Sequence, residues 1–177
     1  MAIIKSVRGR TPKTGENTFL AETAVLLGDV TVGRDCSIWY GAVLRGDVNS
    51  ITIGDRTNIQ DCAVIHTLYD ESPNPSQTRI GSDVSVGHGA IIHGATIEDR
   101  CLIGMGATIL DNAHVPSGCI IAASALVLSG ARLEPNSVYA GVPAKKVKEI
   151  TPEQSRDIVE RTASDYRIYA SWYDDEA

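Results

Sequence analysis

The chain has 177 residues and a formal net charge of −6, and it is long enough to bury the core of one domain without disulfides. Aromatic residues make up only 5% of the sequence, so the core must be built from small and β-branched residues, which suit short strands and tight turns. The acidic balance and the lack of a large Lys/Arg cluster argue against a nucleic-acid partner.

The first fifteen residues contain no apolar segment of the kind that directs secretion, and nowhere do eighteen apolar residues run together. We therefore expect a cytoplasmic protein with no membrane partner. The four cysteines form no CxxC pair, so we predict buried, reduced thiols without a catalytic role at Cys36, Cys62, Cys101 and Cys119.

Aliphatic residues recur every six positions through most of the chain. A helix would repeat every 3.6 residues and an alternating strand every 2, so a sustained period of six predicts a parallel β-helix, an all-β solenoid in which three flat sides close one coil. The repeating positions are Leu26, Val32, Ile38 and Leu44, then Ile53, Ile59 and Ile65, then Ile80, Val86 and Ile92, and from Ile97 onward Ile103, Ile109, Val115, Ile121, Val127 and Leu133.

The repeats divide one domain, residues 1–177, into three parts. We predict an N-terminal cap over 1–25 and a β-helix of about six coils over 26–140. Two insertions are expected to loop out of the coils, one near Val48 to Ser50 and one at residues 69–77.

A C-terminal helix is predicted over residues 151–173. Thr151 is expected to cap it, with Pro152 in the first helical position and Gln154 completing a capping box. Apolar residues then recur at helical spacing, so the helix should lie along the coils or against a neighbouring subunit. Residues 139–147 are expected to connect the last coil to this helix.

Three of the four histidines lie between residues 66 and 93. One column of the solenoid should contain Leu26, Leu44, Ile65, Ile92, Ile109 and Val127, and the residues that follow these should share an outward position on successive coils. Arg45, His66 and His93 should therefore form a ladder. Adjacent coils lie about 4.8 Å apart, so His66 and His93 could bind one metal ion.

His88 should lie at another corner, because five extended residues separate it from His93 by roughly 15 Å. A neighbouring subunit must then supply the third imidazole. The spacing predicts a cyclic homo-oligomer, with three subunits favoured by the triangular coil, whose metal sites combine His66 and His93 of one chain with His88 of the next. Three imidazoles and an open position are typical of catalytic zinc.

Five motifs resemble those of γ-class carbonic anhydrases and their bacterial relatives, within the superfamily of left-handed hexapeptide-repeat β-helices. They are "RGD" at 45–47, "NIQD" at 58–61, the histidine at 66, "GHGAIIHG" at 87–94 and "IGMGA" at 103–107. The resemblance implies the left hand of the solenoid and the reversible hydration of CO2 to bicarbonate. Zinc is the expected metal, with Fe(II) or Co(II) as alternatives, because imidazole suits several divalent ions.

The resemblance also implies roles for single residues. Arg45 and Asp47 resemble an ion pair at the subunit interface. Asn58 and Gln60 resemble residues that orient the bound water or bicarbonate, although an asparagine turn ladder is an equally good interpretation of Asn58. Asp61 lies beside them with a part in the same network.

Tyr139 looks like a tyrosine found near the active site in some members of the family. The best-studied type of γ-class enzyme uses glutamates as proton shuttles, one directly after "RGD" and one on an acidic loop. Here Val48 follows Asp47, and Asp70 and Glu71 are the carboxylates of the corresponding loop. The sequence therefore shows no evident proton-shuttle glutamate.

Other functions remain open. A hexapeptide acyltransferase is suggested by the fold and by "GVPAKK" at 141–146, with His114 as the one histidine left to act as a base. The same metal site could instead serve a hydrolase or thioesterase. A weakly active component of a larger assembly is the third possibility.

Overall fold

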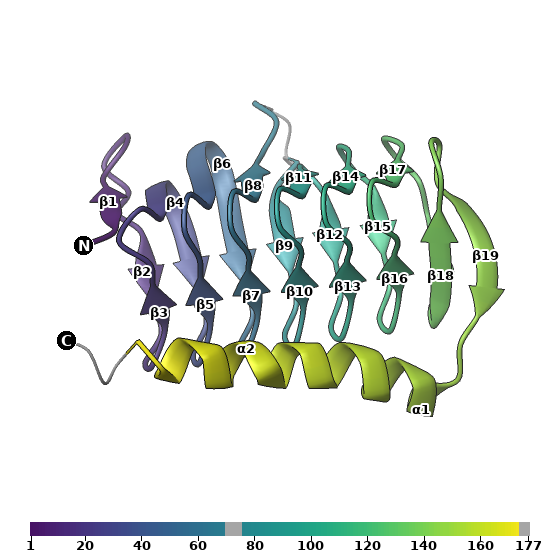
Figure 1. The fold of residues 1–177 in the computed structure, drawn as a ribbon. Coiled ribbons are helices and arrows are strands. Elements are labelled where there is room, and N and C mark those ends of the chain that lie inside the picture. The colour runs from purple at the N-terminus through teal and green to yellow at the C-terminus, as the bar shows by residue number, and fades with distance from the viewer. Residues whose placement is uncertain (70–75, 174–177) are drawn as a thin grey trace.

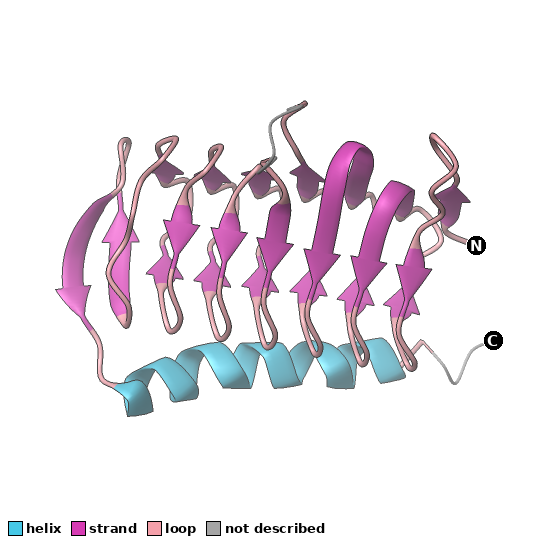
Figure 2. Cartoon of the chain, turned by 180° about the vertical axis from the view of Figure 1, so that it is seen from behind, coloured by secondary structure: helices cyan, strands magenta, loops and turns pink. Residues whose placement is uncertain are grey.

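The computed structural model describes residues 1–69 and 76–173. The chain winds into the predicted left-handed parallel β-helix, and a single C-terminal helix runs back along one edge of the stacked coils (Figure 1). Figure 2 shows the same arrangement from behind, with one short strand per side in most coils.

Hydrogen bonds join the described strands into two sheets. An eight-stranded sheet forms one side of the coils from β3 (Phe19–Leu20), β5 (Ser37–Ile38), β7 (Asn58–Ile59), β10 (Ser85–Val86), β13 (Leu102–Ile103), β16 (Ile120–Ile121), β18 (Ser137–Ala140) and β19 (Lys145–Glu149). An eleven-stranded sheet contains β1 (Ile3–Lys5), β2 (Lys13–Thr14), β4 (Val25–Val32), β6 (Val43–Ile53), β8 (Val64–His66), β9 (Thr78–Ile80), β11 (Ile91–His93), β12 (Thr96–Ile97), β14 (Thr108–Ile109), β15 (His114–Val115) and β17 (Leu126–Val127).

The larger sheet covers two sides of the solenoid because β4 and β6 bend around a corner. The first part of β6 pairs with β8, and its last part pairs with β9. At the bend Gly28 pairs with Gly46 but Val30 pairs with Ile51, so β6 has three more residues there than β4. The insertion predicted near Val48 to Ser50 is confirmed.

The predicted aliphatic column is also confirmed. Each member pairs with the next in parallel register, and every side chain in the column is at most 1% exposed: Leu26, Leu44, Ile65, Ile92, Ile109 and Val127. Stacking of this kind buries apolar surface from one coil against the next, which is the main stabilising force in a solenoid.

The smaller sheet has seven parallel rungs, because antiparallel β19 is the last of its eight strands. The sequence predicts about six coils, and the additional rung comes from the segment predicted to be the cap. There Lys13–Thr14 pairs with Thr31–Val32, and Phe19–Leu20 pairs with Ser37–Ile38. Thr14 occupies a repeat position, and its polar side chain hides the period of six from a search for aliphatic residues.

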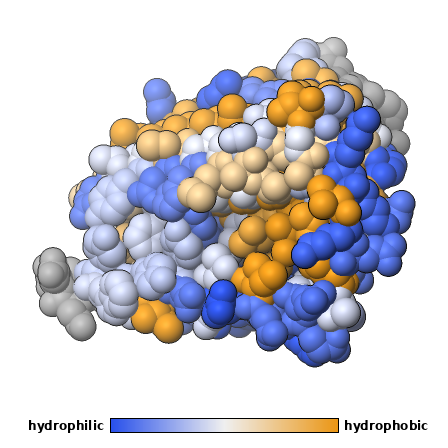
Figure 3. Space-filling view, turned by 45° about the vertical axis from the view of Figure 1, so that its right-hand side comes forward, coloured by the Kyte–Doolittle hydropathy of each residue, from blue (hydrophilic) through white to orange (hydrophobic). Residues whose placement is uncertain are grey.

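The far end of the solenoid is closed by β19, which begins within residues 139–147, the segment expected to be a simple connection, and continues to Glu149. It pairs antiparallel with β18, from Ser137 opposite Glu149 to Ala140 opposite Lys145. Val142 and Val147 are 71% and 62% exposed at this end. Figure 3 turns this end forward and shows hydrophobic patches interrupted by hydrophilic side chains.

The C-terminal helix begins with the predicted capping box. The Thr151 hydroxyl accepts a hydrogen bond from the Gln154 amide at 3.2 Å, and the Gln154 side chain accepts one from the Thr151 amide at 3.0 Å. The helix comprises α1 (Pro152–Ser155), a π-helical turn (Arg156–Glu160) and α2 (Arg161–Ser171). No helix in the described part of the chain has the length and apolar character needed to cross a membrane.

Three of the four cysteines are buried as predicted, but Cys62 is exposed at a corner of the solenoid with φ of 58°, so the prediction of a buried thiol is wrong there. Burial raises the pKa of Cys36 to about 11 and that of Cys101 to about 12, and it also raises the pKa of Cys119. These three thiols pack in the core.

Candidate metal centre

His66 and His93 lie side by side at the ends of adjacent strands. β8 and β11 pair in register, with His66 opposite His93. The Nδ1 atom of His66 lies 3.0 Å from the Nε2 atom of His93. The predicted ladder continues to Arg45, whose guanidinium lies 3.4 Å from the same Nδ1 atom of His66.

The other nitrogen of each ring faces a carboxylate. His66 Nε2 lies 3.1 Å from Asp47, and His93 Nδ1 lies 2.6 Å from Asp111. A carboxylate accepts the N–H of a neutral imidazole, so the nitrogens that face each other both carry lone pairs. The guanidinium of Arg45 can only donate, which supports the same assignment for His66 Nδ1.

Burial and charge keep His66 in the neutral, metal-binding protonation state. Burial lowers the pKa of His66, and the charge of Arg45 adds to that effect, although Asp47 opposes it. Burial raises the pKa of Asp47, but hydrogen bonds from Arg45 and His66 outweigh it and leave the pKa below its ordinary value. At neutral pH the arrangement is therefore a neutral imidazole beside an ionised carboxylate.

His88 belongs to a separate cluster at another corner, two residues beyond β10. Its Nδ1 atom lies 2.9 Å from Asp61, and its Nε2 atom lies 3.2 Å from the hydroxyl of Tyr166 on α2. Within residues 1–69 and 76–173 of one chain, no three His, Cys, Asp or Glu side chains come together as a metal site. The single chain thus brings together two of the three predicted ligands.

Asn58 and Gln60 are buried beneath His88 in one chain of hydrogen bonds. The side-chain carbonyl of Gln60 accepts a hydrogen bond from the backbone amide of His88 at 3.1 Å. The side-chain amino group of Gln60 donates to the side-chain carbonyl of Asn58 at 3.0 Å. Asn58 in turn donates to the Ser85 hydroxyl on the next coil at 2.8 Å. The amide of Gln60 is therefore held in one orientation beside a predicted ligand.

Arg45 and Asp47 form their ion pair within the chain, at 2.7 Å. Tyr139 lies in the core on β18, three rungs from Val86 in the same sheet, and its hydroxyl accepts from the Glu134 amide at 2.9 Å. Within one chain the structure does not bring Tyr139 to His66, His88 or His93. Asp70 and Glu71 lie outside the described residues.

His114 stands apart from both histidine clusters. It lies on β15, and its Nε2 atom is 2.8 Å from Glu98, which also accepts from the amide and hydroxyl of Ser117 at 3.0 Å each. The hydrogen bond with His114 lowers the pKa of Glu98.

The donor set fits a divalent metal. Each of the three histidines has one nitrogen on a carboxylate, which is the usual arrangement of metal-ligating imidazoles. The other nitrogens of His66 and His93 face each other, and the other nitrogen of His88 lies against the Tyr166 hydroxyl. Zinc accepts such ligands at about 2.0–2.1 Å, and imidazole also suits Fe(II) and Co(II). Two lone pairs 3.0 Å apart repel unless a cation lies between them.

Two site residues were missed from the sequence. Asp111 directly follows Leu110, which occupies the ladder position one coil above His93, so its place next to the ladder could have indicated it. No repeat pattern points to Tyr166, because its contact depends on where the C-terminal helix docks. Its ring packs edge-on against Trp39 at 5.4 Å between centroids.

Comparisons with known proteins agree with the fold. The family model for the bacterial transferase hexapeptide, described as six repeats, matches residues 11–46 and 77–111. A Methanocaldococcus jannaschii protein named "Probable carbonic anhydrase" is 52% identical over 82% of this chain and 88% of its own length. The "Carbonic anhydrase" of Geobacillus kaustophilus is 42% identical over 97% of this chain and 91% of its own.

The chain spans 55% and 59% of the length of two mitochondrial γ carbonic anhydrases of Arabidopsis thaliana, with which it shares 42% and 40% identity. Among solved structures, a hexapeptide transferase family protein from Anaplasma phagocytophilum superimposes with a TM-score of 0.89. It shares 34% identity, and the match covers 97% of this chain and 98% of that one.

Proposed function

Because the chain belongs to the γ-class carbonic anhydrase family of hexapeptide-repeat proteins, we propose that it catalyses the reversible hydration of CO2 to bicarbonate at a metal site shared between two subunits. The observation that carries the proposal is the pair of facing lone pairs on His66 and His93, each ring held by a carboxylate.

His66 and His93 of one chain would hold the metal with His88 of a second chain. A divalent metal in such a site lowers the pKa of bound water to about 7 and so supplies hydroxide at neutral pH. Asp47, Asp61 and Asp111 keep the three rings in the required tautomer. Gln60, fixed by His88 and Asn58, is placed to orient CO2 or bicarbonate by hydrogen bonding.

A second copy of the chain is needed because His88 lies at a different corner from the other two ligands. Val64 and Ile91 precede the two ladder histidines by two residues and are 36% and 42% exposed. Apolar side chains beside the ligands suit an interface between subunits. A triangular coil favours three copies related by a cyclic axis, so we propose a homotrimer with zinc, or Fe(II) or Co(II), at each interface.

Stopped-flow CO2 hydration on samples with counted metal tests the reaction, with zinc-loaded protein and with protein loaded anaerobically with Fe(II). We expect turnover above buffer that disappears in His88→Ala and persists in His114→Ala, the matched control outside the site. If one metal ion is bound per chain but no CO2 hydration is measured, the metal site is supported and the proposed reaction is refuted.

Hybrid assemblies test the sharing of the site. His66→Ala and His88→Ala chains, each defective alone, should recover metal binding when they are mixed and refolded together, because some interfaces then combine two intact halves. Failure of every hybrid to bind metal refutes the shared site.

Acyl transfer is the second candidate, favoured by the transferase name of the Anaplasma phagocytophilum structure and by the His114–Glu98 pair, which could act as a base. Coenzyme A binding that His114→Ala reduces would support it. A metal-dependent thioesterase would instead hydrolyse thioesters in a way that His88→Ala abolishes, and incorporation into a larger complex without turnover would indicate an assembly component.

A further inference from the structure

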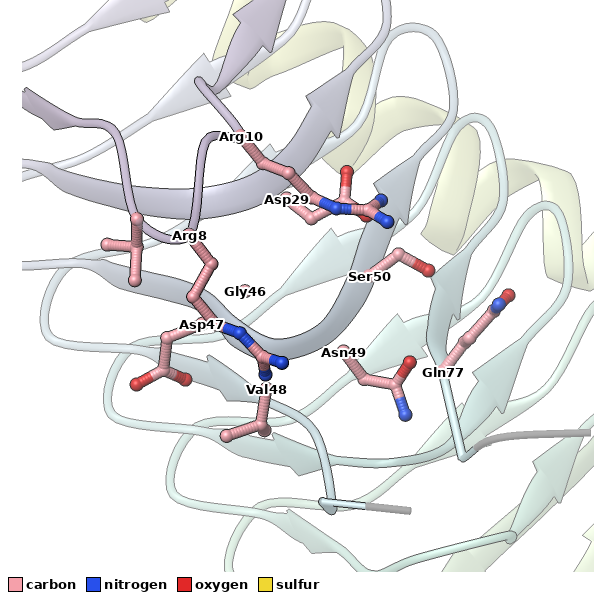
Figure 4. Close-up of a pocket in the computed structure, with 10 residues that line it drawn as sticks. Arg8, Arg10, Asp29, Gly46, Asp47, Val48, Asn49, Ser50 and Gln77 are labelled. Carbon is pink, nitrogen blue, oxygen red and sulfur yellow. The ribbon is translucent and has the colours of Figure 1, made fainter. Parts of the chain in front are cut away.

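A cavity of about 460 Å³ adjoins the bend of β6, where the N-terminal turn lies against the coils (Figure 4). Its lining is polar and contains no aromatic residue: Val7, Arg8, Arg10, Asp29, Gly46, Asp47, Val48, Asn49, Ser50 and Gln77. Of its lining residues only Asp47 belongs to the proposed metal site, and none is a predicted metal ligand.

Two arginines reach the cavity from a tight turn. The backbones of Val7 and Arg10 hydrogen bond to each other at 3.0 and 3.1 Å, with Arg8 at the tip of the turn. Arg10 pairs with Asp29. Arg8 forms no hydrogen bond or ion pair with any residue that the structure describes, so its guanidinium is the uncompensated positive charge of the cavity.

The remaining polar groups offer both donors and an acceptor. The carbonyl of Gln77 accepts from Arg79, which leaves its amino group to donate. The amino group of Asn49 donates to the Leu68 carbonyl, which leaves its own carbonyl to accept. Ser50 adds a hydroxyl, and Figure 4 shows it between Arg10 and Asn49 on the wall of the cavity.

The balance of charges around the cavity favours a ligand that carries a single negative charge. Arg10 is neutralised by Asp29, and Asp47 is neutralised by Arg45, which leaves Arg8 alone. A guanidinium binds a carboxylate through two parallel hydrogen bonds. The volume lies within the range of about 300–1,000 Å³ typical of small-molecule pockets, which bicarbonate alone would not fill.

We propose that this cavity binds a small hydroxycarboxylic acid, with the carboxylate on Arg8 and the hydroxyls among Asn49, Ser50 and Gln77. The site stands on its own geometry and does not depend on CO2 hydration. It adjoins the metal centre, because Asp47 lines the cavity and also accepts the hydrogen bond from His66.

Titration of metal-loaded, ¹⁵N-labelled protein with D-glycerate, followed by backbone amide chemical shifts, tests the site. We expect saturable shifts confined to Arg8, Arg10, Asn49 and Ser50, with a Kd on the order of 1 mM. Neutral glycerol should cause none. Arg8→Gln should raise the Kd by about tenfold or more, because a charged hydrogen-bonded pair is lost.

Arg100→Gln is the matched control, since Arg100 is exposed and has a φ of 53° against 52° for Arg8. An equal loss of affinity in Arg100→Gln would assign the binding to general charge and overturn the proposal. Tighter binding of inorganic phosphate at these cavity amides, or equally tight binding of bicarbonate there, would overturn the class of ligand. Absence of saturable shifts with glycerate would overturn the site itself.

Discussion

The Nδ1 atom of His66 and the Nε2 atom of His93 face each other across 3.0 Å, and both carry lone pairs because Asp47 and Asp111 take the other nitrogens. A cation between them removes their repulsion.

Metal removal should therefore destabilise the protein, and a chelator should lower the Tm. A metal at about a hundred times its Kd stabilises by about 2.7 kcal/mol, which is a shift of roughly 5–10 °C for a domain of this size. Calorimetry of His66→Ala should show no chelator-dependent shift; a shift of the same size there would contradict the assignment.

Replacement of Asp111 should weaken metal binding without removing a ligand. Asp111→Asn takes away the carboxylate that fixes the tautomer of His93, so the metal Kd should rise by about 10–100-fold in a chelator competition assay. Asp83→Asn is the control, because Asp83 pairs with Arg56 at 2.7 Å, outside both histidine clusters. Equal metal affinity in the two variants would refute the role of Asp111.

The phenol of Tyr166 should ionise only at high pH. Burial raises its pKa to about 12, so the difference in ultraviolet absorbance between the wild type and Tyr166→Phe should titrate near that value and not near the ordinary value of about 10. The folded state favours the neutral phenol, so this group's contribution to stability is present below about pH 10 and is lost as the pH rises through 12. A difference titration centred near pH 10 would show that the phenol is exposed.

The cysteines should divide into one reactive and three protected thiols. At pH 8 a thiol reagent should modify Cys62 rapidly in the folded protein, whereas Cys36, Cys101 and Cys119 are buried with raised pKa values. Denaturation should make all four thiols reactive. Rapid modification in a Cys62→Ser variant would indicate that the coils open locally.

Loss of a core side chain should cost far more than loss of an exposed one. Ile109→Ala, at a fully buried position of the column, should lower the free energy of unfolding by about 2–5 kcal/mol. Val147→Ala, 62% exposed on β19, should change it by about 0.5 kcal/mol or less. Denaturant unfolding of metal-free protein measures both, and similar costs would mean that the column does not carry the stability.

The part of the site that repeats with the coils could be predicted from the sequence. A period of six sets which residues stack, so the column of Ile65 and Ile92 also placed His66 on His93. The same register excluded His88 from the pair. The strand pairings and the buried column followed from one physical requirement, the burial of aliphatic side chains at every coil.

The remaining features depend on contacts that have no period. The helix capping box was predictable because it is local, but the docking of Tyr166 on His88 arises from tertiary packing against Trp39. The repeat pattern does not reveal the first coil, because Thr14 stands where the next coil has the aliphatic Val32. β19 was missed because its pairing with β18 breaks the parallel rule of the other rungs.

The antiparallel pairing of β19 also prevents the coils of a second molecule from stacking onto this end of the solenoid. A parallel rung left open at that end would offer its unpaired backbone groups to the first coil of another molecule, and such stacking could continue into a fibre. β19 reverses the chain direction there and carries three lysines. Lys146 pairs with Glu134 and Glu149, and the charges of Lys145 and Lys148 oppose the approach of a further strand. Growth along the solenoid axis is thereby blocked, while the sides of the prism remain available for association.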